Sequence, residues 1–389
     1  MKNFYNLIVR EFKLFGTNTV MLAIFIAAPI AYAILTGAVY KDAKVTDLPI
    51  LIVDLDETPF SDKVIDALND NQYLKVMEVR RTREDFKAEL LKNNYQAVVT
   101  IPENFQADIE QKRHPEISAE INSGNMLTGN YTTTGIMSVL GTLNAGFEIG
   151  SLQKKGMPTA IASEQFESFQ ISVSRFYNPS SNYLMFLWPG MLGTIMQQVF
   201  LLIFALSFGK EFVTKSIGDL LKISKSPTYL ILVKSVPYWI IGFIVWFPLL
   251  KILMPYFDVP MVEGKFAFML ITVLFVLSLT FLGIAVSVAI PSPIKATEIL
   301  MIVATPSFII SGQTWPSSQM PVWVQDIAAC IPLTHYLEAF RRLLLYNASL
   351  KEILPQIIGL IIITLVSFLA AFVLLKIKIK RFEKNLSKL

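Results

Sequence analysis

Six stretches of this 389-residue sequence are long and apolar enough to cross a lipid bilayer as helices. A helix needs about 20 predominantly apolar residues to span about 30 Å of hydrocarbon. The stretches run over residues 19–40, 184–208, 229–250, 266–290, 296–314 and 353–375. The fifth is the weakest, because Pro306 interrupts its dense part. Since 53% of the residues are hydrophobic and only 16% are charged, we expect an α-helical integral membrane protein with six transmembrane helices.

The long interval between the first two stretches, residues 41–181, has the composition of a soluble domain. It holds 14 Lys and Arg against 20 Asp and Glu, whereas the rest of the chain holds 20 against 10. Short β-rich runs alternate there with polar segments of helical spacing, which predicts an inserted α/β domain. The expected strands are 49–53, 74–79, 97–101 and 117–121, the expected helices are 58–68, 82–91 and 102–109, and a longer helix follows over 125–155.

The distribution of Lys and Arg in the short loops predicts the orientation, because positive residues are retained on the cytoplasmic side. With the N-terminus inside, 14 of these residues fall in cytoplasmic segments and five in short external ones. Both termini are therefore expected in the cytoplasm. Residues 41–181 are expected outside, as an extracytoplasmic domain, and residues 182–389 as a five-helix transmembrane region.

Residues 1–18 show an apolar rhythm of helical spacing that only Glu11 interrupts. The pattern predicts a cytoplasmic helix lying in the membrane interface. Another interpretation makes the first apolar stretch a cleaved signal peptide, because Ala31-Tyr32-Ala33 is similar to a small-residue cleavage site.

Few residues are suited to metal, nucleotide or catalytic chemistry. Cys330 is the single cysteine and there are two histidines, which excludes cysteine-based zinc sites and His-rich metal centres. The acids of Asp54-Leu55-Asp56-Glu57 admit a cation site, yet capping of a helix that starts near Thr58 explains them without an ion. No G-x-x-x-x-G-K-[ST] motif and no catalytic constellation occurs. We therefore expect no enzyme, no metal and no cofactor bound by this chain.

The expected spans also lack ionisable side chains at mid-membrane depth. Lys234 lies near the cytoplasmic end of the third span, where its stem is expected to reach the headgroups. Because carriers driven by ion gradients need such groups, energy must enter elsewhere. In segment 209–227, charges alternate with an apolar set at Phe212, Ser216, Leu220 and Ile223. This spacing predicts a short amphipathic helix, which either docks on a partner or lies free in the interface.

Residues 313–346 are too polar to cross the membrane, but they are rich in aromatics and prolines. Aromatic side chains prefer the headgroup zone, so we expect hairpin or re-entrant helices at the outer mouth, including one over 333–346. His335 lies in this segment, where a hydrogen bond to a neighbour and a gating role are both open.

At this point the chain resembles the permease subunits of ABC-2 type exporters, in particular those with a large external domain between the first two spans. The resemblance covers nearly the whole chain and implies the fold of type V exporters. Its most specific parts are Tyr177-Asn178-Pro179 before Trp188-Pro189-Gly190, then Gly209-Lys210-Glu211, and finally Pro306 to Gly312, Trp315-Pro316, Met320-Pro321-Val322-Trp323 and Pro332-Leu333-Thr334-His335-Tyr336.

The resemblance implies a homodimer, or a dimer with a similar permease, in the bacterial inner membrane, seated on a cytoplasmic ATPase dimer that supplies ATP and Mg²⁺. The residues implied in coupling to that ATPase are Lys210, Glu211, Phe212, Ser216, Asp219 and Leu220. The candidates for the pathway or for dimer packing are Gly190, Gly193, Pro306, Ser311 and Gly312, where small residues permit close approach of helices and suit plain packing equally well. Membrane lipid and a periplasmic adaptor are further expected partners, and nucleic acid is not. The alternative function is a non-transporting envelope scaffold or receptor.

Overall fold

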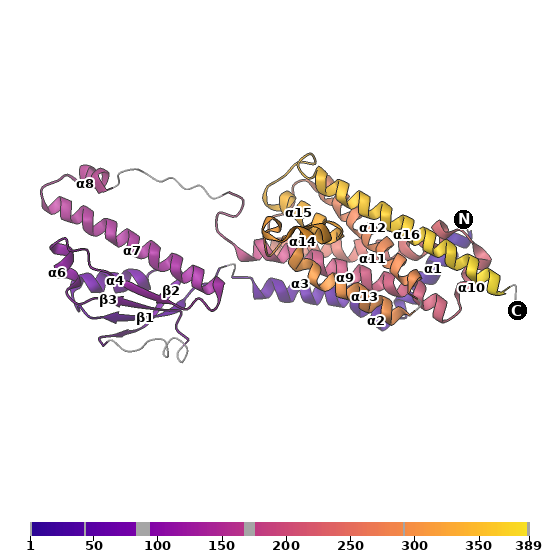
Figure 1. Ribbon diagram of the computed structural model, residues 1–389, viewed down its shortest axis with the longest axis horizontal. Coiled ribbons are helices and arrows are strands. Elements are labelled where there is room, and N and C mark those ends of the chain that lie inside the picture. Colours follow the sequence, from indigo (N-terminus) through magenta and orange to yellow (C-terminus); the bar gives the residue numbers. More distant parts are fainter. Residues whose placement is uncertain (1, 43, 83–93, 167–175, 291, 387–389) are drawn as a thin grey trace. The chain divides into compact units, whose positions relative to one another are not determined.

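The computed structural model describes residues 2–42, 44–82, 94–166, 176–290 and 292–386. The chain divides into two compact units, one formed by residues 1–43 and 175–389 and the other by residues 44–174 (Figure 1). The first unit, called the helical body below, is built from helices wherever it is described. The second is an α/β domain inserted into it.

Six helices among the described residues are long and apolar enough to cross a membrane, as the sequence predicts. They are the helix made of α2, η1 and α3 (Thr19–Val39), α9 (Tyr183–Val213), α11 (Pro227–Tyr256), α12 (Lys265–Ala289), α13 (Pro293–Ile310) and α16 (Leu354–Leu386). Three helices continue past their expected ends, namely α16 to Leu386, α11 to Tyr256 and α9 to Val213. The first part of segment 209–227 is therefore the end of a transmembrane helix.

Helix α9 lies at the centre of the body. Its most apolar stretch is 72% buried, against 22% for those of α13 and α16. Directed hydrogen bonds fix its neighbours, since Trp188 Nε1 donates to the carbonyl oxygen of Ala33 at 3.0 Å and Gln197 Nε2 donates to Ser307 Oγ at 2.7 Å. Such bonds and close packing hold transmembrane helices together, because lipid is as apolar as the helix surfaces.

Short helices cover the two ends of the body. Helices α1 (Lys2–Gly16) and α10 (Ile217–Ile223) lie at the end that also holds both chain termini (Figure 1). Between α13 and α16 come η2 (Ser317–Gln319), α14 (Val322–Ala329) and α15 (Pro332–Leu345). The helix predicted over 333–346 is confirmed as α15, which buries Tyr336, Leu337 and Phe340.

The inserted domain contains a four-stranded sheet in the order β2-β1-β3-β4. The central β1 (Leu48–Asp54) is parallel to β2 (Leu74–Arg80) and β3 (Ala97–Ile101), and β4 (Ser118–Ile121) is antiparallel to β3. The four predicted strands are thus present. Its described helices are α4 (Pro59–Asn69), α6 (Phe105–Glu110), α7 (Met126–Lys154) and α8 (Thr159–Phe166). The helix predicted over 82–91 lies, apart from Thr82, outside the described residues.

The acids at the end of β1 make capping contacts. Asp54 Oδ1 accepts hydrogen bonds from the backbone N–H of Asp56 at 3.0 Å and of Glu57 at 3.2 Å, and Asp54 Oδ2 accepts from Ser61 Oγ at 2.8 Å. Thr58 and Ser61 form a capping box at the start of α4. The described residues contain no group of His, Cys, Asp or Glu side chains placed to hold a metal ion.

Candidate coupling site and charge cluster

Segment 209–227 consists of the last turn of α9, a turn over 214–216, helix α10 and a short link to α11. The turn requires a left-handed backbone at Lys215, with φ of 58°. This break ends the expected helical rhythm. Ile217, Leu220 and Leu221 face the helical body, whereas Ile223, expected on the same apolar side, is 40% exposed. The predicted short amphipathic helix is present as α10, but the continuous helical spacing expected from Phe212 to Ile223 was wrong, because the turn over 214–216 changes which residues point inward.

The structure places the six predicted coupling residues at different depths. Lys210 and Asp219 are exposed, and Phe212 and Ser216 are half-buried. Glu211 and Leu220 are buried, with exposures of 4% and 1%. Only the first pair therefore lies fully open to a partner.

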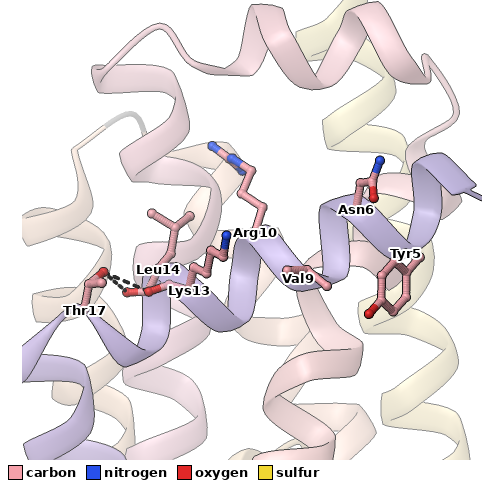
Figure 2. Close-up of a pocket in the computed structure, with 7 residues that line it drawn as sticks. All are labelled: Tyr5, Asn6, Val9, Arg10, Lys13, Leu14 and Thr17. Atoms are coloured by element: carbon pink, nitrogen blue, oxygen red, sulfur yellow. Dashed lines mark hydrogen bonds between the residues drawn. The ribbon is translucent and has the colours of Figure 1, made fainter.

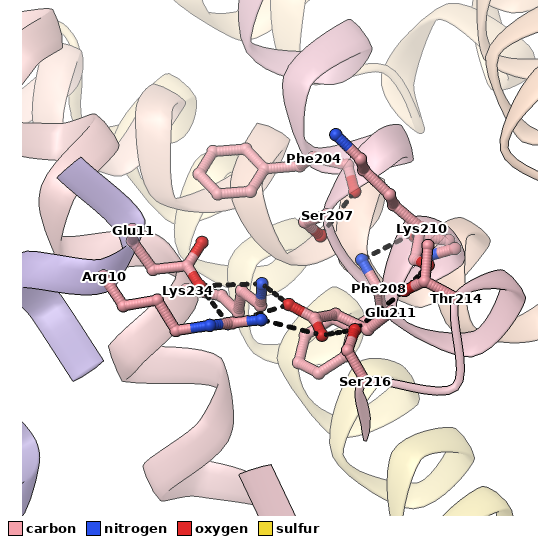
Figure 3. A network of polar contacts seen from close by, with 12 residues as sticks. Arg10, Glu11, Phe204, Ser207, Phe208, Lys210, Glu211, Thr214, Ser216 and Lys234 are labelled. Carbon is pink, nitrogen blue, oxygen red and sulfur yellow. Dashed lines mark hydrogen bonds and ion pairs between the residues drawn. The ribbon is translucent and has the colours of Figure 1, made fainter. Parts of the chain in front are cut away.

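Glu211 belongs to a charge cluster that we define as Arg10, Glu11, Glu211 and Lys234 (Figure 3). Lys234 Nζ lies 2.9 Å from Glu11 Oε1 and 2.5 Å from Glu211 Oε1. Arg10 holds Glu211 with two nitrogens, at 2.9 and 3.2 Å, and contacts Glu11 at 2.9 Å. Two positive and two negative groups from α1, α9 and α11 thus form one neutral network.

The expectation that Lys234 reaches the headgroups was wrong. Its side chain is only 4% exposed, and it lies between the carboxylates of Glu11 and Glu211. Burying a charge without a partner costs roughly several kcal/mol of folding free energy. Two local acids remove that cost without extension of the side chain to the surface.

Arg10 lies at the rim of the charge cluster, with 34% of its side chain exposed. Burial by itself lowers its pKa, but the hydrogen bonds and charges of Glu211 and Glu11 outweigh burial and raise the pKa. The guanidinium therefore stays charged, and its planar fork can hold one carboxylate with two nitrogens.

Two further contacts tie the end of α9 to its surroundings. Ser216, which precedes α10, donates a hydrogen bond to Glu211 Oε2. Ser287 Oγ of α12 accepts from the backbone N–H of Phe208 at 3.1 Å and of Gly209 at 2.9 Å. The end of α9 is thus joined to α1, α10, α11 and α12.

The charge cluster was not predicted from the sequence, although the sequence contains two local signals of it. Glu11 interrupts the apolar side of α1, and Lys234 interrupts an apolar span. Each signal shows a buried or interfacial charge. Neither identifies its partner, because the ion pairs join residues 201 and 223 positions apart.

The outward side of α1 forms a shallow hollow of about 450 Å³. Figure 2 shows the residues that line it, namely Tyr5, Asn6, Val9, Arg10, Lys13, Leu14 and Thr17. The opposite side of α1 buries Leu7, Glu11 and Phe15 against the body. This two-sided helix agrees with the amphipathic pattern in the sequence.

Among the predicted pathway residues, Gly190, Gly193 and Ser311 pack inside one chain, whereas Pro306 is exposed. A Cβ at Gly190 would lie 2.9 Å from Gln313, and one at Gly193 would lie 2.6 Å from Leu337. Ser311 is buried, Gly312 has φ of +83°, and Pro306 is exposed in α13. At the same end, His335 Nε2 lies 2.8 Å from the carbonyl oxygen of Ala329.

The sequence and this fold together define the class of protein. The chain belongs to the family of ABC-2 family transporter proteins, whose profile matches residues 19–373. It is a multi-pass membrane protein and the membrane subunit of a transporter.

Individual relatives agree with this class. The chain is 24% identical over 377 residues to the inner membrane transport permease YhhJ of Escherichia coli, and the aligned region covers 93% of this chain and 94% of that protein. It is 25% identical over 211 residues to the probable multidrug ABC transporter permease YbhR of Escherichia coli, covering 54% and 57%. The ABC transporter G family member 20 of Dictyostelium discoideum is 27% identical over 216 residues, covering 54% of this chain and 28% of that protein. No solved structure matches the chain significantly.

Proposed function

We propose that this chain is the permease subunit of an ATP-binding-cassette exporter, driven through segment 209–227 by a separate cytoplasmic ATPase dimer. One observation carries the proposal. Segment 209–227 exposes the charged side chains of Lys210, Lys215 and Asp219 and buries the apolar side chains of Ile217 and Leu220. A segment of this kind can be gripped by a partner and pass movement to the helices behind it. ATP and Mg²⁺ would then belong to the partner, and this chain would bind no cofactor.

The proposed orientation places both termini in the cytoplasm and the inserted domain outside the bacterial inner membrane. The open side of α1, with Lys13 and Tyr5, would lie among lipid headgroups. Helices α13 and α16 are little buried in one chain, which suits contact with lipid and with a second permease copy or a similar permease. A periplasmic adaptor is the proposed partner of the acidic inserted domain, and nucleic acid is not a partner.

The cargo to test first follows from a relative. The name of one similar permease includes the words probable multidrug. We therefore propose amphiphilic organic compounds, moved outward, as the first candidates for the substrate.

The docking face is tested by exchanging two of its charges. Asp219 and Lys222 form an exposed pair at 2.9 Å, one turn apart on α10. The double variant Asp219→Lys with Lys222→Asp keeps the pair and the net charge, but reverses the pattern that a partner meets. After reconstitution in lipid discs with the partner ATPase, we expect binding to weaken at least about tenfold, which corresponds to about 1.4 kcal/mol, and vanadate-sensitive ATP hydrolysis to fall with it.

A matched control is Lys112→Glu with Glu148→Lys. It exchanges an exposed pair of the inserted domain and should leave ATPase binding unchanged. If the α10 exchange binds the ATPase as the unaltered chain does, or if no ATPase binds the unaltered chain, coupling through segment 209–227 is refuted.

A further inference from the structure

We infer that the charge cluster transmits the movement of segment 209–227 to α1 and α11, with Glu211 as its central positioning residue. This inference rests on the proposed function, and it adds the route by which movement leaves the docking face.

The bonding of Glu211 supports an internal role. Its Oε1 contacts Arg10 and Lys234, and its Oε2 accepts hydrogen bonds from Arg10 and Ser216. Both oxygens are engaged inside the chain, and the residue is only 4% exposed. Glu211 is therefore placed to pass on a displacement that partner contacts produce at neighbouring exposed positions.

The connections start at α10. Ser216 precedes this helix and donates to Glu211, so displacement of α10 acts on the carboxylate through a single side chain. Buried Ile217 and Leu220 keep α10 against the body, which limits how far it can move without carrying its neighbours along. From Glu211 the network divides, through Arg10 to α1 and through Lys234 to α11.

The chemical nature of the cluster also favours a role in transmitting movement between helices over a role in holding them together. Apolar side chains of similar volume often hold buried helices together as well as an ion pair or better. Elsewhere on its inner side α1 already uses Leu7 and Phe15 for this purpose. Ion pairs with hydrogen-bonding geometry also specify an orientation. The two hydrogen bonds that Arg10 donates to Glu211 fix the orientation of α1 relative to the end of α9.

The test removes the charges of α1 as a neutral pair. Arg10→Gln with Glu11→Gln leaves Glu211 paired with Lys234, so no uncompensated charge stays buried. In a Cys330→Ser background, spin labels report two distances. One joins positions 213 and 377, from segment 209–227 to α16, and the other joins positions 5 and 377, from α1 to α16. The side chains of Tyr5, Val213 and Ile377 are exposed.

In the unaltered network, both distances should change by about 1–2 Å, the scale of helix shifts in switching proteins, when the partner ATPase is trapped with ATP and vanadate. In the Arg10→Gln, Glu11→Gln variant, the 213–377 distance should still change, whereas the 5–377 distance should not. Lys112→Gln with Glu148→Gln, which removes an exposed neutral pair, should leave both changes intact.

A 5–377 change that survives loss of the α1 charges overturns the inference and leaves the proposed function standing. Absence of any 213–377 change in the unaltered network overturns both. If the first variant does not fold, Glu11→Leu with Lys234→Met removes the other neutral combination and keeps the contact between Arg10 and Glu211. A third distance, between positions 232 and 377, reports on α11, because Leu232 and Ile377 are exposed and can carry labels. It should change on trapping with ATP and vanadate in the unaltered network and not in this variant, and a change that persists in the variant refutes the link to α11.

Discussion

Charged residues in the two units are held by different surroundings. In the helical body, Lys234 and Glu11 are almost completely buried and depend on each other. In the inserted domain, Glu78 lies on β2 in open contact with water, and it pairs with Arg80 at 2.8 Å and accepts from Tyr95 at 3.0 Å. The Glu78 side chain is 43% exposed and that of Arg80 is 20% exposed. Because water screens such a pair, it contributes little to stability, and removing one partner there should have a mild effect. Removing one partner of the charge cluster should cost more.

The pair on β2 gives a pH dependence whose sign follows from its pKa. The hydrogen bonds from Arg80 and Tyr95 lower the pKa of Glu78 below its usual 4.5. The stability that this contributes is present above pH 4.5 and is lost as the pH falls through the lowered pKa. In Arg80→Gln, the decrease in the Tm of the inserted domain should be largest near neutral pH and should shrink below pH 4.5.

The measurement is a series of thermal unfolding curves of the purified chain at different pH values. Lys75→Gln, on the same strand and exposed, is the control for loss of one positive charge. A decrease for Arg80→Gln that is equally large at acid and neutral pH contradicts the assignment.

Among the elements, α9 decides the arrangement of the helical body. It contacts α12 closely enough that a Cβ on Gly283 would lie 2.6 Å from the Cβ of Phe204. Because Phe204 Cβ is fixed to the backbone, a side chain at residue 283 must push the two helices apart. This contact, together with the hydrogen bonds that Ser287 Oγ accepts from the last turns of α9, therefore fixes the position of the charge cluster.

We predict that Gly283→Ala lowers the free energy of unfolding by about 1–3 kcal/mol, the cost of overpacking a filled interior. The lower Tm should be visible in detergent micelles. The control is Gly141→Ala in α7, where nothing lies within 4 Å of the added Cβ and helix propensity favours alanine by roughly 0.5–1 kcal/mol. Equal Tm values for the two variants would show that α9 and α12 can separate without cost.

At the scale of the whole molecule, one transmembrane helix, α9 (Tyr183–Val213), comes between the inserted domain and helix α10 in the order of the chain. If the chain spans the membrane as proposed, reagents on one side reach the inserted domain and reagents on the other reach α10.

We predict the corresponding labelling pattern in intact spheroplasts carrying Cys330→Ser. An impermeant maleimide should modify Lys112→Cys, because this position is exposed in the inserted domain. It should not modify Asp219→Cys until the membrane is permeabilised, although the side chain at 219 is the more exposed of the two, at 78% against 44%. Modification of position 219 before permeabilisation places segment 209–227 outside and removes the basis for an ATPase partner there.

Local patterns in the sequence determined the parts of this protein. The six spans, the amphipathic α1, the strands β1 to β4 and the long α7 follow from hydrophobic length, period and capping residues, all of which act between near neighbours in the chain. The continuation of α9 to Val213 and the turn at 214–216 were not predicted, because an apolar span can end or continue as its neighbours allow.

Only the tertiary structure decided how Glu211 is used. The sequence shows an acid in a charged segment, which is typical of a solvated surface, and the structure buries it between Arg10 and Lys234. Buried charge needs a partner at about 3 Å, and that partner is supplied by helices whose packing angles no local pattern encodes. Hydrophobic length determines which segments enter the membrane, whereas the pairing of charges depends on how those segments pack against one another.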